Sequence, residues 1–198
     1  MKVLLGLSRL VDALNERVGR IVLWLVLASV LISAGNAIVR KVFGTSSNAW
    51  LEIQWYLYAA VFLMAAGYTL KYNEHVRIDV ITGRFSPRTR NWIDVFGLTV
   101  FLMPWALLMV WLGWPFFMQA YVSGEVSSNF GGLIRWPVYI FIPLGFGLLG
   151  LQGISELIKR VAFLLGQAPD PLSKQIDKTA EEELAEFVRN QQRADGTK

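Results

Sequence analysis

Four long segments without a charged residue dominate the pattern of hydrophobic and polar positions along the chain. These segments are residues 21–39, 53–70, 95–124 and 136–155, each with Lys or Arg close to one end. The second segment, at eighteen residues, reaches about 27 Å as an α-helix, close to the ~30 Å hydrocarbon thickness of a bilayer. The pattern predicts an all-α integral membrane domain over residues 21–165, with four transmembrane helices over about residues 21–40, 51–71, 91–114 and 136–159.

The third segment is longer than a bilayer requires, so part of it is predicted to be loop. We expect its helix to end near Gly113 to Pro115, because proline restricts the residue that precedes it. Pro104 and Pro143 lie inside the third and fourth predicted spans. Each can kink its helix, since the carbonyl that loses its backbone donor must find another partner.

Residues 1–20 show the periodicity of an amphipathic helix. One face collects Val3, Leu4, Leu7, Leu10, Val11, Leu14 and Val18, and the other collects Lys2, Arg9, Asp12, Glu16 and Arg20. We therefore predict an interfacial helix that lies along the membrane before the first span. A signal peptide is the alternative, but charged residues interrupt any continuous apolar stretch in this segment.

Composition agrees with a membrane protein, because 54% of the 198 residues are hydrophobic and only 17% are charged. The chain has no Cys and a single His, His75. This excludes a Cys-based redox centre, a bis-His haem or a His-rich metal site built from this chain, so we predict no cofactor and no catalytic residue. The net charge of +4 comes from segments that flank the membrane, which indicates contact with membrane lipid rather than with nucleic acid.

Lys and Arg are distributed unevenly among the segments that connect the predicted spans. There are four before the first span, five in residues 71–90 and seven from Lys159 onward, against two in the first hairpin and one before the fourth span. The positive-inside rule then places both termini in the cytoplasm. Residues 166–198 are predicted to be a soluble cytoplasmic tail, in which residues 179–190 could form a short helix.

A polar stripe follows the first predicted span. Ser29, Ser33, Asn36 and Arg40 are separated by four, three and four residues, which places them on one side of a helix. We expect the stripe to face protein and to supply hydrogen bonds between helices. A path for substrate or ions is the alternative.

Trp50 and Glu52 begin the second predicted span after a short turn. Small residues share a face with Glu52 along this helix, so another helix can approach it closely. We therefore predict that Glu52 is buried near the interface, with Arg40 or Lys41 as its ion-pair partner across the hairpin.

The chain contains a series of short motifs in an order typical of one family. The series is Asn36 and Arg40, Trp50 and Glu52, Gly67-Tyr68, His75-Val76-Arg77-Ile78-Asp79, Pro87-Arg88, Glu125-Val126-Ser127-Ser128, Trp136, Pro143-Leu144-Gly145 and Gln152. Over about residues 10–165 the chain resembles the small membrane subunit of a tripartite ATP-independent periplasmic (TRAP) transporter. Family members often carry a Glu-Glu pair after the Trp, whereas this chain has Ile53 in the second place.

The resemblance implies a multi-pass protein of the bacterial or archaeal cytoplasmic (inner) membrane, bound to a large permease subunit that moves as an elevator. A periplasmic substrate-binding protein would deliver an organic acid, and an ion gradient would drive symport, since the sequence has no phosphate-binding glycine loop. The chain would then be a scaffold. The residues predicted for structural or partner contacts are Asn36, Arg40, Trp50, Glu52, His75, Arg77 and Asp79.

Glu125 and Arg135 lie in the loop before the fourth span, and we predict that they help to dock the binding protein. A solvated loop without a partner is the alternative. The rival functions are a membrane enzyme and a self-contained oligomeric channel. For an enzyme the best acid–base pair is His75 with Asp79, which is more simply a structural surface pair, and for a channel only the polar stripe of the first span could line a pore.

Overall fold

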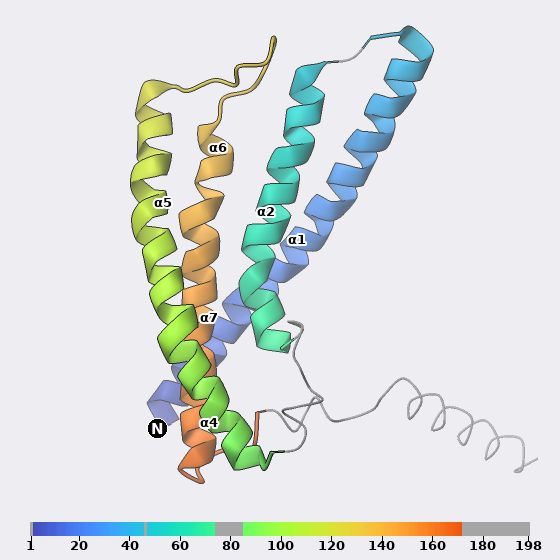
Figure 1. Cartoon of the computed structure of the whole chain (residues 1–198). Coiled ribbons are helices and arrows are strands. Elements are labelled where there is room, and N and C mark those ends of the chain that lie inside the picture. The colour runs from blue at the N-terminus through green and yellow to red at the C-terminus, as the bar shows by residue number, and fades with distance from the viewer. Residues whose placement is uncertain (1, 46, 74–84, 172–198) are drawn as a thin grey trace, which may run out of the picture.

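The computed structural model describes residues 2–45, 47–73 and 85–171 (Figure 1). In these ranges the chain is helical, with no β-strand beyond a single bridge between Val126 and Ile134. The elements are α1 (Lys2–Phe43), α2 (Asn48–Tyr72), α4 (Pro87–Gly97), the π-helix η1 (Leu98–Leu102), α5 (Met103–Ser123), α6 (Trp136–Tyr139) and α7 (Phe141–Leu164). Four stretches are long and apolar enough to cross a membrane: Val3–Phe43, Asn48–Tyr72, Pro87–Ser123 and Trp136–Leu164. The predicted all-helical fold with four spans is confirmed.

α1 is one continuous helix of 42 residues, about 63 Å long at ~1.5 Å per residue. This length is roughly twice the thickness of the hydrocarbon layer. No break separates residues 20 and 21, so the segment predicted as a separate interfacial helix is the first half of α1. α1 runs obliquely across the bundle and packs on α2 and α7 (Figure 1). The placement of its first half along the membrane surface stays a prediction.

The third span continues to Ser123, and the prediction that its helix ends near Gly113 to Pro115 is wrong. Pro115 lies inside α5, where membrane helices tolerate proline because neighbouring groups satisfy the freed carbonyl. Pro104 follows the π-helix η1, whose Leu98 carbonyl accepts from the backbone N–H of Met103. The π-helix widens the turn just before Pro104, where the helix lacks a backbone N–H donor because proline has none.

Close helix contacts depend on glycines, as two positions that face α2 illustrate. A Cβ added at Gly145 of α7 would lie 2.6 Å from the backbone oxygen of Leu63 in α2, and one added at Gly19 of α1 would lie 2.2 Å from the ring of Tyr68. Neither position has room for a side chain, so α2 approaches both α1 and α7 at the distance that glycine permits.

Large apolar side chains point outward along the spans, while several of the most deeply buried side chains are polar. Phe62 is 79% exposed and Trp111 is 71% exposed, whereas Asn15, Asn91 and Gln152 are fully buried. This is the reverse of a soluble domain, where apolar side chains fill the interior. The outward faces fit lipid or another membrane protein, and the interior is held in part by hydrogen bonds.

Candidate functional site

Polar side chains gather at two opposite ends of the bundle. We call the first group the α1–α7 cluster: Ser8, Asp12, Asn15, Gln152, Ser155, Glu156, Lys159 and Arg160. We call the second group the Glu52 site: Glu52, Ser127, Asn129 and Leu133. The first lies near the N-terminus of α1, and the second lies where the loop after α5 meets the start of α2 (Figure 1).

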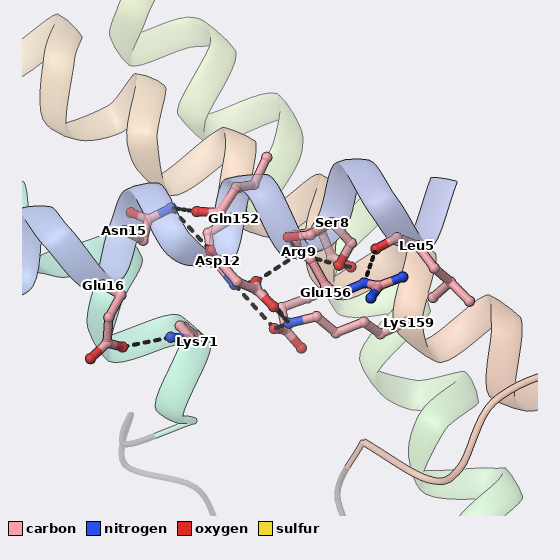
Figure 2. Close-up of polar contacts among 12 residues, drawn as sticks. Leu5, Ser8, Arg9, Asp12, Asn15, Glu16, Lys71, Gln152, Glu156 and Lys159 are labelled. Carbon is pink, nitrogen blue, oxygen red and sulfur yellow. Dashed lines mark hydrogen bonds and ion pairs between the residues drawn. The ribbon is translucent and has the colours of Figure 1, made fainter. Parts of the chain in front are cut away.

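The α1–α7 cluster begins with neutral hydrogen bonds between the two helices (Figure 2). The hydroxyls of Ser8 and Ser155 are 2.7 Å apart, and Asn15 Nδ2 donates to Gln152 Oε1 at 3.0 Å. Gln152 Nε2 in turn donates to Asp12 Oδ1 at 2.9 Å. Three successive turns of α1 are thereby joined to α7.

Charged groups complete the cluster. Lys159 Nζ lies 2.7 Å from a carboxylate oxygen of Asp12 and 2.7 Å from one of Glu156. Arg160, whose side chain is 2% exposed, pairs with Glu156 and also contacts Asp94 of α4 at 3.1 Å. Every buried charge here has an opposite charge beside it, which is the condition under which burial is tolerated.

A third helix joins the same end of the bundle through Glu16 of α1. Lys71 Nζ of α2 donates to Glu16 Oε2 at 2.6 Å, and the hydroxyl of Tyr72 donates to the same oxygen at 2.5 Å. Figure 2 shows this contact one helical turn from Asp12. Two acidic residues of the charged face of residues 1–20, Asp12 and Glu16, therefore contact α7 and α2.

The α1–α7 cluster was not predicted, although the sequence carries a signal for it. Ser8, Asp12 and Asn15 are separated by four and three residues, and polar residues 152, 155 and 159 of α7 by three and four. Two helices with matching polar stripes can pair these stripes with each other. An amphipathic pattern alone does not distinguish this arrangement from a polar face in water.

Glu52 is 5% exposed, as predicted, but its predicted partner is wrong. Its carboxylate accepts from the hydroxyl of Ser127, from Asn129 Nδ2 at 2.8 Å and from the backbone N–H of Leu133 at 2.7 Å. Three neutral donors from one loop thus satisfy the charge, and neither Arg40 nor Lys41 pairs with any acid in the described part of the chain.

Arg40 and Lys41 instead line a groove of about 470 Å³ between α1 and α2, with Ser33, Asn36, Ala37, Leu51 and Gln54. Of the predicted polar stripe only Ser29 is fully buried, at 1% exposure. Asn36 is half-buried, and Ser33 and Arg40 are exposed. The stripe is therefore covered by protein at Ser29, and its later residues line the groove near the C-terminal end of α1.

Glu125 and Arg135 contact each other at the base of the loop between α5 and α6. Their side chains pair at 2.9 Å, and the Arg135 N–H donates to the Glu125 carbonyl, also at 2.9 Å. Hydrogen bonds to Tyr139 and Glu125 raise the pKa of Arg135 above its ordinary value. Both residues thus help to close the loop.

Of the remaining predicted contact residues, the structure describes Trp50. Trp50 is 50% exposed at the start of α2. His75, Arg77 and Asp79 lie outside the described residues. Within the ranges that the structure covers, no three His, Asp or Glu side chains gather as metal ligands. The carboxylates of the two sites are engaged by cations, amides and hydroxyls, so their arrangement serves to join helices and to fix a loop.

The chain was compared with known families. The family described as "Tripartite ATP-independent periplasmic transporters, DctQ component" matches residues 29–163, more than half of the chain. This range includes the Glu52 site and the α7 side of the α1–α7 cluster, whereas Ser8, Asp12 and Asn15 precede it. No curated protein and no solved structure matches the chain. The chain belongs to the DctQ family and is a small membrane component of a tripartite ATP-independent periplasmic transporter.

Proposed function

We propose that this chain is a scaffold for the large permease subunit of its transporter and does not itself bind the transported substrate. The large subunit would move as an elevator against it and carry an organic acid, delivered by a periplasmic binding protein and driven by an ion gradient.

The observation that carries this proposal is the position of the charges. The buried charged groups in the described ranges lie in the α1–α7 cluster and at Glu52, near opposite ends of the helices, and they are already engaged. The middle of each span lacks a charged residue. An organic anion would need a cationic or strongly donating group there, and a group of this kind inside a membrane is the usual mark of a substrate path.

The outward apolar surface supports the same role. Trp24 of α1 (71% exposed), and Phe101 (67% exposed) and Trp105 (57% exposed), which lie one helical turn apart on the third span, are left largely uncovered by the described part of the chain. In a membrane, such surfaces contact lipid or another helical subunit. A large permease subunit is the partner that membership of this transporter family provides.

The distribution of Lys and Arg supports the orientation with both termini in the cytoplasm. The Glu52 site and the 125–135 loop would then face the periplasm. Cysteine placed at Ser47 should react with an impermeant thiol reagent in intact cells, and cysteine placed at Gln167, which is also exposed, should react only after permeabilisation. Labelling of Gln167→Cys in intact cells would contradict this orientation.

Calorimetry tests the scaffold role. The purified chain, titrated with candidate organic acids in the presence of sodium, should give no saturable heat, whereas the complex with its large subunit should support uptake. A specific isotherm at micromolar acid for the chain alone would show that it is part of the substrate path.

A further inference from the structure

Phe130 occupies the tip of the loop between α5 and α6. At 96% exposure it is the most exposed large apolar side chain in the described part of the chain. In Figure 1 this loop projects past the start of α6. An aromatic ring left in water costs free energy that burial against a partner would recover.

The loop that carries Phe130 is held to the bundle at several points. Asn48 Nδ2, at the start of α2, donates to the Phe130 carbonyl at 2.9 Å, and the Tyr56 hydroxyl donates to the Ile134 carbonyl at 3.1 Å. Glu52 binds three further groups of the loop, and the Glu125–Arg135 pair closes its base. A ring presented on a fixed backbone loses little conformational entropy on binding, which is the property of a good anchor.

The surroundings of Phe130 favour a soluble protein over lipid as its partner. The tip is built from Ser128, Asn129, Gly131 and Gly132. Irregular backbone of this kind does not enter the hydrocarbon layer. At the same end of the bundle, Arg40 and Lys41 are exposed and pair with no acid among the described residues. An exposed aromatic ring at the same end of the bundle as two exposed cations is complementary to an apolar pocket that is bordered by acidic residues.

We propose that Phe130 is the anchor through which this chain docks the periplasmic binding protein, with Arg40 and Lys41 facing acidic residues of that protein. Glu125 and Arg135 then act by holding the loop in shape. Glu52 is a positioning residue for the same loop. This inference rests on the proposed function, because it requires that the loop lie on the side from which the binding protein arrives.

A photocrosslinking residue tests the contact directly. Phe130→p-benzoylphenylalanine keeps an aromatic ring at the tip, and Val122→p-benzoylphenylalanine is a matched control at an exposed apolar position of α5 (78% exposed). On illumination of the assembled transporter with its binding protein, residue 130 should crosslink to the binding protein and residue 122 should not. Crosslinking of residue 130 to the large subunit alone, to lipid alone, or to nothing would overturn the proposal.

Uptake kinetics test the energetic role. Phe130→Ala should raise the binding-protein concentration that gives half-maximal uptake by about tenfold, the effect of losing one interfacial anchor, and saturating binding protein should restore the maximal rate. Ser128→Ala, at an exposed neighbour in the same loop, should change neither value. Equal behaviour of the two variants would contradict the anchor role.

The Glu52 variant separates positioning from a general structural defect. Glu52→Gln should weaken docking in the same way, and adding Phe130→Ala to it should weaken docking little further, since both changes remove the same presented ring. Full additivity would show that Glu52 does not act through Phe130. If wild-type chain fails to copurify with the large subunit, the proposed function fails; if copurification and uptake are intact and Phe130→Ala is silent, only this inference fails.

Discussion

The α1–α7 cluster and the Glu52 site both bury carboxylates, but the partners of these carboxylates differ in charge. In the first, Asp12 and Glu156 meet Lys159 and Arg160. In the second, Glu52 meets two side-chain donors and one backbone N–H, all neutral. This difference corresponds to the elements that each site connects. The α1–α7 cluster connects helices to one another, whereas the Glu52 site connects a helix to a loop.

This comparison shows how one chain can be fixed at one end and can present a shaped surface at the other. Ion pairs are strong only where both charges are removed from water, and Arg160, 2% exposed, meets this condition with Glu156 of the same helix while it also contacts Asp94 of α4. A carboxylate that accepts from backbone and side chains of a loop determines the conformation of that loop, because each donor must stay in place. The first site therefore holds the bundle together, and the second shapes the 125–135 loop.

The largest effect should come from removing the buried cation of the α1–α7 cluster. Arg160→Met should lower the free energy of unfolding by about 3 kcal/mol, the low end of the cost of breaking a buried pair, because Lys159 still contacts Glu156. Denaturant unfolding in detergent measures this value. Glu156→Gln together with Arg160→Met should recover part of the loss. A double variant as unstable as the sum of the two single variants would show that the pair is not coupled.

A smaller effect is expected in the middle of the bundle, away from both polar sites. Gly145→Ala should destabilise by about 2 kcal/mol, because its methyl group would overlap the backbone of Leu63. Gly147→Ala is the matched control, since a Cβ there meets nothing within 4 Å. Thermal unfolding of the two variants should differ clearly. Equal melting temperatures would show that α2 and α7 are less closely packed than the structure has them.

The Glu52 site should respond locally rather than globally. Glu52→Gln should speed amide hydrogen exchange over residues 126–134 and leave exchange in α7 unchanged, because it loosens one loop. Arg40→Gln should leave the exchange of this loop as it is. In a double-mutant cycle the two changes should be additive, since Arg40 does not contact Glu52. Coupling between the two changes would support the predicted ion pair between Glu52 and Arg40.

The sequence predicted the spans because uncharged length is a direct consequence of bilayer thickness. It did not predict how polar residues pair, because pairing depends on which distant segments meet. Glu52 finds its partners in the loop at Ser127 to Leu133, rather than at Arg40 twelve residues away. In the same way, Asp12 lies on a helix face that resembles a surface in contact with water, and only the position of α7 shows what covers it.

Pro115 illustrates a second limit of the pattern. Its effect on the preceding residue correctly indicates a possible helix end in water. In a membrane an unpaired backbone is costlier than a distorted helix, so α5 continues through the proline to Ser123. A local rule was thus overridden by the solvent in which the helix lies.

A distance measurement in the working transporter tests the scaffold role most directly. The chain has no Cys, so Ser47→Cys and Gln167→Cys can carry spin labels at opposite ends of the bundle, in a complex whose other subunits lack reactive cysteines. The account predicts one distance distribution that is unchanged when binding protein, organic acid and sodium are added, while distances from either label to the large subunit shift. A change in the distance within this chain upon substrate addition would contradict its role as a fixed scaffold.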